Sequence, residues 1–131
     1  MQPRERKRPV VLIVEDEVLV RIDTREMVEA ADFEVVEAGN ADEAIAILAA
    51  RDDIHLIFTD VHMPGSMNGL KLAHFVRNRW PPVALIVTSG HAHVEETDLP
   101  TGGRFLSKPY QQAKIEGLLR QLISVGPPAS E

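Results

Sequence analysis

The chain has 131 residues, 44% of them hydrophobic, which suffices for one compact domain with a real core but leaves no room for a second. The formal charge of −6 disfavours nucleic-acid binding, because phosphate contacts require a basic surface. Cysteine is absent, so disulfides and thiolate metal sites are excluded. No apolar run approaches the roughly 20 residues that span a bilayer. We therefore expect a cytoplasmic protein that binds neither nucleic acid nor membrane.

The first third of the chain alternates strand-like and helix-like patterns. Residues 10–14 (VVLIV) predict a buried strand, and residues 33–37 predict a second one. Between them, apolar positions recur with helical period. Asn40 is a predicted N-cap with Glu43 three residues later, which is a partial capping box for the next helix. Val20, Thr24, Met27, Val28 and Ala31 fall on one side of the first helix, and the second has an apolar stripe formed by Ala41, Ala44, Ile45, Leu48 and Ala49.

The alternation continues to the end of the chain. Residues 55–59, 83–87 and 103–107 predict three more strands. Residues 63–69 have turn composition, and Pro81-Pro82 ends the helix that follows them. The two later helices are expected to bury Leu72, Ala73 and Val76, and Ile115, Leu118, Leu119, Leu122 and Ile123.

The segment 90–102 predicts only a short or irregular fourth helix, because it holds few apolar positions, a proline and two adjacent glycines. Strands that alternate with helices imply right-handed crossovers and a doubly wound α/β fold with helices on both faces of a parallel sheet. We expect this domain over 9–124, with a flexible basic N-terminus at 1–8 and a flexible tail at 125–131. A docking or nucleic-acid arm remains the alternative for the basic end.

Charged side chains follow three of the predicted strands. Glu15-Asp16 follows the first strand, Asp60 the third and Lys108-Pro109 the fifth. Ligands bind at the carboxyl ends of strands in parallel α/β sheets, so these groups are expected to meet at one rim although they are far apart in sequence. A charge at the edge of a core must be compensated, which favours a built site.

Four motifs occur in order at predicted strand ends: E-D-E at 15–17, T-D-V-H-M-P at 59–64, V-T-S-G at 87–90 and F-L-S-K-P at 105–109. With these motifs the chain resembles the receiver domain of two-component response regulators, especially the stand-alone type related to the chemotaxis regulator. The resemblance covers about residues 9 to 124. It implies a flavodoxin-like sheet of five parallel strands in the order 2-1-3-4-5.

The resemblance implies that Asp60 is a phosphoacceptor for a sensor histidine kinase, a histidine phosphotransfer protein or a small donor such as acetyl phosphate. It also implies a Mg²⁺ or Mn²⁺ site formed by Glu15, Asp16, Asp60 and the backbone carbonyl of His62. The chemistry is consistent with this, because like charges about 4 Å apart repel by roughly 4 kcal/mol at an effective dielectric constant of 20. A hard divalent cation relieves such repulsion, and Lys108 neutralises charge from a second side.

Three further residues take roles by the same resemblance. The hydroxyl of Thr88 is expected to donate to the phosphoryl group, and Phe105 occupies the position of the family's switch aromatic. Pro109 resembles the family's cis proline, which aims Lys108 inward. The module then signals by conformational change or passes the phosphate on, and it does not turn over an external substrate.

Each site residue also has a simpler structural interpretation. Asp60, Glu15 or Asp16 could cap a helix, and Lys108 could be an ordinary surface residue before a turn. Ser89 could replace Thr88, or the threonine hydroxyl could be structural. The loop histidines His91 and His93 are interpreted as a solvated pair rather than a transition-metal site.

The chain departs from the family pattern at three places. The loop after Pro64 is one residue longer than usual, Phe105 lacks the hydroxyl of a tyrosine, and the stretch 88–108 is slightly short. These departures touch the surface that receivers commonly use for output, so we do not expect that face to be used unchanged.

Three other functions compete with a phosphorylated receiver. One is a degenerate receiver that only binds partners, which the intact acids and Lys108 disfavour. Another is a phosphohydrolase of the haloacid dehalogenase type, which needs a second acid where His62 stands. The last is a flavodoxin-like FMN binder, whose phosphate the acids at 15–17 would repel.

Overall fold

The computed structural model describes residues 8–90 and 94–123. The predicted flexible ends, apart from Arg8, and the His91 and His93 pair lie outside these residues. None of the helices in the described part of the chain is long and apolar enough to cross a membrane.

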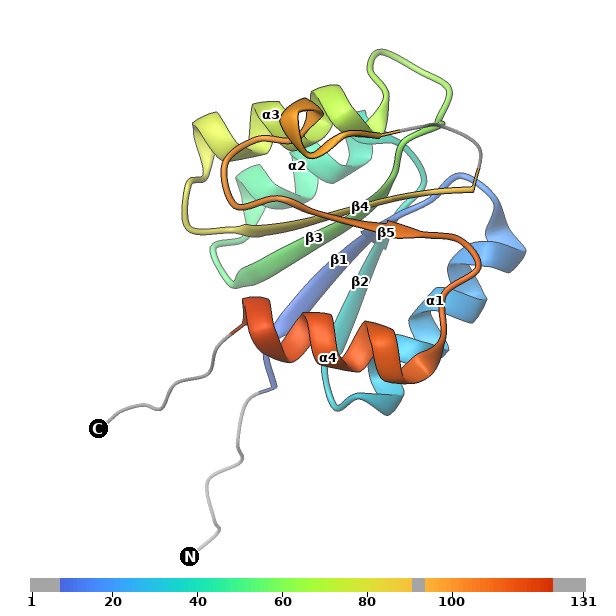
Figure 1. Cartoon of the computed structure of the whole chain (residues 1–131). Coiled ribbons are helices and arrows are strands. Elements are labelled where there is room, and N and C mark those ends of the chain that lie inside the picture. The colour runs from blue at the N-terminus through green and yellow to red at the C-terminus, as the bar shows by residue number, and fades with distance from the viewer. Residues whose placement is uncertain (1–7, 91–93, 124–131) are drawn as a thin grey trace, which may run out of the picture.

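Five parallel strands form one sheet in the order β2-β1-β3-β4-β5, which confirms the predicted topology (Figure 1). The strands are β1 (Val10–Val14), β2 (Glu34–Ala38), β3 (Ile54–Asp60), β4 (Ala84–Ser89) and β5 (Arg104–Ser107). The helices are α1 (Val18–Ala30), α2 (Ala41–Ala50), α3 (Gly69–Arg79) and α4 (Gln112–Leu122), with a 3₁₀ turn η1 (Glu96–Asp98). The first predicted strand has the observed bounds, and the other four differ from them by one or two residues at their ends.

Two helices cover each face of the sheet, and each face has its own core (Figure 1). Helices α1 and α4 pack on one face, where the buried residues include Ile13, Phe58, Ile86, Leu106 and Ile115. Helices α2 and α3 pack on the other face, where the buried residues include Leu12, Ile57, Val87, Leu48 and Leu72. Since side chains alternate along a strand, the strand residues fall into these two sets in turn.

Side-chain caps begin the two helices on the second face. Asn40 accepts a hydrogen bond from the backbone N–H of Glu43 at 2.9 Å, as predicted. The Glu43 carboxylate, however, accepts from the N–H of Gly39 at 2.7 Å, so the box closes one residue earlier than a standard capping box. Asn68 caps α3 by accepting from the N–H of Lys71 at 2.9 Å.

The connection between β4 and β5 carries the short fourth helix that the sequence predicts. Only the three residues of η1 are helical between Val94 and Gly103, and they lie beside α3 (Figure 1). Polar contacts hold the segment: His74 bonds the carbonyl of Asp98 at 2.8 Å, and Arg77 donates to the carbonyl of Thr101 at 2.9 Å. Leu99 is the buried apolar anchor.

Candidate functional site

The pleat of the sheet delivers the predicted site residues to one face. Glu15 comes two residues after Ile13, and Lys108 two residues after Leu106, whose side chains lie in the core under α1 and α4. Asp60 likewise comes two residues after Phe58 of the same core. Residues two apart along a strand point to the same side, so all three charged groups emerge together at the carboxyl ends of β1, β3 and β5.

A backbone hydrogen bond joins each of the three strand ends to a neighbouring strand. The N–H of Glu15 donates to the carbonyl of Ala38 at 3.1 Å, which extends the pairing of β1 with β2. The N–H of Val61 donates to the carbonyl of Thr88 at 2.9 Å, and the N–H of Lys108 donates to Ser89 at 3.1 Å. The rim that carries the charged side chains is therefore a continuation of the sheet, not a set of independent loops.

A single ammonium group lies between two of the acids. The Lys108 Nζ atom is 3.1 Å from Glu15 Oε1 and 3.2 Å from Asp60 Oδ1. Carboxylate oxygens of Glu15, Asp16 and Asp60 all lie within 4.8 Å of one another. Asp16 is exposed, whereas the other two acids are buried. All three acids line a pocket of about 570 Å³, together with Glu17, Val20, His62, Gly90, Lys108 and Pro109.

Burial and charge act against each other on these groups. Burial raises the pKa of Glu15, and the hydrogen bonds from the N–H of Glu17 and from Lys108 offset this only in part. Burial lowers the pKa of Lys108, but the attraction of Asp60 and the hydrogen bond to Glu15 outweigh it and leave that pKa raised. Lys108 is thus a firmly protonated counter-charge for the acidic cup, as we call the cluster of Glu15, Asp16 and Asp60.

The donor set fits a hard divalent cation. Three carboxylates against one ammonium leave a net negative charge at the site, and each acid of this trio offers an oxygen, the ligand that Mg²⁺ prefers. The exposed Asp16 leaves one side open to water, and Mg²⁺ commonly keeps several waters.

The remaining predicted residues surround this cup. Thr88 is buried and pairs in register with Asp60, so the two side chains point to the same face. Ser89, its alternative, is also buried but belongs to the opposite face by strand alternation. The Lys108–Pro109 peptide bond is cis, as the resemblance implied. Phe105 is half-buried and packs against the core under α2 and α3, away from the cup.

The structure argues against the capping and surface interpretations of these residues. Asp60 is the last residue of β3, and Asn68 caps α3 instead. No side chain caps α1, although the Glu15 carboxylate accepts from the N–H of Glu17 at 3.1 Å. Lys108 is held by two ion pairs and is not an ordinary surface residue.

Sequence reasoning missed two supports of the site. Arg21 in α1 donates from Nη1 to the backbone carbonyl of Glu15 at 2.7 Å. The Tyr110 hydroxyl, which follows the Lys-Pro pair, bonds the Thr24 hydroxyl, while its ring packs edge-on against Phe58. The only sequence feature that indicated a supporting role for Arg21 was its position one helical turn after Glu17. No sequence feature indicated that the Thr24 and Tyr110 hydroxyls would meet.

The chain matches the model of the response regulator receiver domain over residues 11–120. It is 31% identical over 118 residues to the aerobic respiration control protein ArcA of Escherichia coli, a match that covers 88% of this chain and 49% of ArcA. It is 36% identical over 90 residues to the hydrogenase transcriptional regulatory protein HoxA of Cupriavidus necator, covering 69% of this chain and 18% of HoxA. The chain therefore spans at most about half the length of these relatives.

Solved structures agree with this assignment. The receiver domain of the hybrid histidine kinase CckA superposes with a TM-score of 0.74 at 29% identity, covering 88% of this chain and 99% of that one. The receiver domain of NtrX from Brucella abortus superposes with a TM-score of 0.80 at 25% identity, again covering 88% and 99%. The fold, the family match and the strand-end motifs lead to one assignment: the chain belongs to the receiver domain family of two-component response regulators.

Proposed function

We propose that this receiver domain takes a phosphoryl group onto Asp60 in a reaction that requires Mg²⁺ or Mn²⁺. The observation that carries the proposal is the position of Asp60, whose Oδ1 is 3.2 Å from Lys108 Nζ in a cup shared with Glu15 and Asp16. The cation would be held by these three carboxylates and by the backbone carbonyl of His62, a residue that lines the same pocket.

The transfer is an in-line displacement at phosphorus. An Asp60 oxygen forms the new P–O bond while the P–N bond of a phosphohistidine donor breaks, and the leaving imidazole nitrogen keeps the electron pair and takes up a proton. A cation held by the three carboxylates would supply positive charge for the phosphoryl oxygens. Lys108 would supply a second positive charge, and its ion pairs with Glu15 and Asp60 keep this ammonium in place before the donor arrives.

The response to phosphorylation is expected to begin at two residues. Thr88 lies on the face of Asp60, so its hydroxyl can donate to a phosphoryl oxygen after a small movement of the end of β4. Phe105 sits on the adjacent strand in register with Val87, next to Thr88, and its half-buried ring can follow that movement. Phe105 has no hydroxyl, so packing alone would select its position.

The phosphodonor is expected to be a sensor histidine kinase or a histidine phosphotransfer protein, as for response regulators in general. A protein partner would then read the phosphorylated state or receive the phosphate. In this role the domain accepts and releases one group and does not turn over an external substrate.

Phosphorylation by acetyl phosphate tests the proposal without a cognate kinase. Incubation with Mg²⁺ should add one acid-stable, hydroxylamine-labile phosphoryl group, measured by intact mass, and EDTA should prevent it. Asp60→Asn should remove the modification. Asp52→Asn, at an exposed position just before β3, is the matched control and should retain it. An Asp60→Asn protein that is still modified to the same extent would place the acceptor elsewhere.

A further inference from the structure

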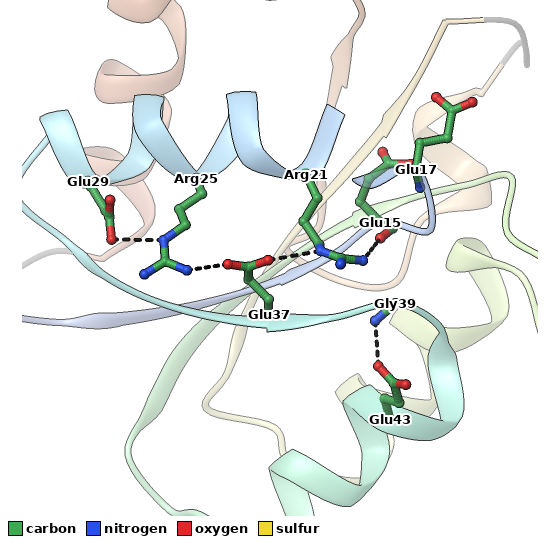
Figure 2. A network of polar contacts seen from close by, with 8 residues as sticks. All are labelled: Glu15, Glu17, Arg21, Arg25, Glu29, Glu37, Gly39 and Glu43. Carbon is green, nitrogen blue, oxygen red and sulfur yellow. Dashed lines mark hydrogen bonds and ion pairs between the residues drawn. The ribbon is translucent and has the colours of Figure 1, made fainter. Parts of the chain in front are cut away.

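Arg21 links the acidic loop at residues 15–17 to strand β2 (Figure 2). Its side chain leaves the first turns of α1 and lies between two acceptors. Nε donates to Glu37 Oε1 at 2.9 Å, and Nη1 donates to the backbone carbonyl of Glu15 at 2.7 Å. Only 20% of the Arg21 side chain is exposed, so water competes weakly for these bonds.

Arg25 shares one of these partners but not the other. It bonds Glu29 at 3.0 Å and the second oxygen of Glu37, and Figure 2 shows it one turn farther from the loop. Burial raises the pKa of Glu37, but the hydrogen bonds of both arginines outweigh it and hold that pKa below its usual value. Glu37 is therefore a fixed anion that orients two guanidinium groups. Of these, only Arg21 hydrogen-bonds the Glu15 backbone within the described part of the chain.

The contact with the Glu15 carbonyl bears on Asp16. The carbonyl and the following N–H belong to one planar peptide unit, so an anchored oxygen fixes the direction in which the chain enters Asp16. The preceding peptide is fixed by the bond from the Glu15 N–H to Ala38. With both planes held, φ and ψ of Glu15 are set, and Asp16 starts from a defined point beside the cup.

Asp16 has little else to hold it. Glu15 is buried and bonded to Lys108 and to the N–H of Glu17, and Asp60 is buried beside Lys108. Asp16 is the exposed member of the trio, and no hydrogen bond or ion pair fixes its carboxylate within residues 8–90 and 94–123. Its position depends on the backbone.

We propose that Arg21 is a positioning residue that orients the Glu15–Asp16 peptide through its contacts with Glu37 and the Glu15 carbonyl. This orientation holds the Asp16 carboxylate where it can bind a divalent cation. The inference rests on the proposed function only in assuming that the cup binds such a cation. Arg21 itself is not among the residues that line the pocket of the cup.

The direction of the effect separates positioning from electrostatics. Arg21 is a cation near a cation site, so removing it should tighten Mg²⁺ binding if charge alone mattered. If Arg21 orients Asp16, removing it should weaken Mg²⁺ binding, because the ligand must be ordered at the moment of binding.

Calorimetric Mg²⁺ titration of the wild-type chain, Arg21→Ala and Arg25→Ala tests the inference. Arg25→Ala is the matched control, since it removes an arginine of α1 that bonds the same Glu37. We expect Arg21→Ala to weaken Mg²⁺ binding by about tenfold, the lower end for loss of a residue that supports a metal ligand, and Arg25→Ala to change it by less than about twofold. Arg21→Lys should also bind more weakly than wild type, because one ammonium cannot reproduce the two-armed geometry of the guanidinium.

A second readout needs no metal. The N–H of Glu17, which donates to Glu15, should exchange with solvent faster in Arg21→Ala than in Arg25→Ala in metal-free buffer. Equal or tighter Mg²⁺ binding by Arg21→Ala would overturn the inference while leaving the proposed function intact. If Arg21→Ala does not fold, wild-type affinity in Arg21→Lys would overturn it. A wild-type chain that does not bind Mg²⁺ would instead refute the cation site itself.

Discussion

Gly69 sets how closely α3 approaches the end of β3, and its replacement by alanine is the sharpest structural test of the site's frame. The N–H of Gly69 donates to the carbonyl of Val61 at 2.9 Å. A Cβ atom at this position would lie 1.8 Å from the backbone oxygen of Asp60, whereas ordinary contacts begin at 3.4 Å. The backbones would have to separate by about 1.6 Å, the difference between these two distances.

Two terms give the expected size of the effect. Overpacking against a backbone that cannot yield costs about 1–3 kcal/mol, and loss of the Gly69 hydrogen bond costs about 1 kcal/mol more. We therefore expect Gly69→Ala to lower the free energy of unfolding by about 2–4 kcal/mol in urea denaturation. Because the displaced atom belongs to Asp60, acetyl phosphate should also modify the folded variant more slowly.

Gly117→Ala provides the matched control. Gly117 lies inside α4, and nothing is within 4 Å of an added Cβ atom there. Alanine is the better helix former, so this variant should gain about 0.5–1 kcal/mol of stability. A Gly69→Ala protein within 1 kcal/mol of wild type would refute the close approach of α3 to Asp60.

Three further measurements test the charges around the cup. Lys108→Met leaves Glu15 and Asp60 uncompensated, so it should lower the free energy of unfolding by about 1–2 kcal/mol in metal-free buffer. The same substitution should tighten Mg²⁺ binding, because a positive charge is removed from the cation site. Weaker Mg²⁺ binding would contradict the counter-charge role of Lys108. Mg²⁺ at ten times its dissociation constant should stabilise the wild type by about 1.4 kcal/mol, or roughly 5 °C in melting temperature. Asp16→Asn should reduce that shift, and a melting temperature independent of Mg²⁺ would count against the metal site. Glu37 has a lowered pKa in the folded state, so its stabilising contribution is present above the unfolded value of 4.5 and lost as pH falls through the folded one. Glu37→Gln should therefore lower the free energy of unfolding by about 1 kcal/mol at pH 7 and by less below about pH 4.5. If chemical denaturation gives the same difference between wild type and variant at both pH values, this expectation is contradicted.

The convergence of Glu15, Asp60 and Lys108 could be predicted from sequence because each follows a recognisable strand. Once the strands are parallel, their carboxyl ends must share one edge, whatever the distance along the chain. The short fourth helix was predictable for a similar reason, since a segment with few apolar residues has nothing to bury. The order of the strands came from the family resemblance and not from the pattern.

The supports of the site were not predictable in the same way. Arg21 reaches Glu37 only because β1 and β2 pair with Ile13 opposite Glu37, a register that single-sequence patterns do not fix. The Thr24 and Tyr110 hydroxyls meet across 86 residues through the packing of α1 beside the last loop. Such contacts depend on side-chain reach and helix placement, which follow from the packed core and not from local periodicity.

The proposed phosphorylation requires that Asp60 is the reactive carboxylate of the cup. Reduction with borohydride converts an aspartyl phosphate into homoserine, so mass spectrometry of peptides can locate the acceptor after treatment with acetyl phosphate and Mg²⁺. Homoserine at position 60, absent when Mg²⁺ is chelated, is the predicted result. Homoserine at another aspartate, a reduced glutamate, or no reduced residue at all would contradict the assignment of Asp60.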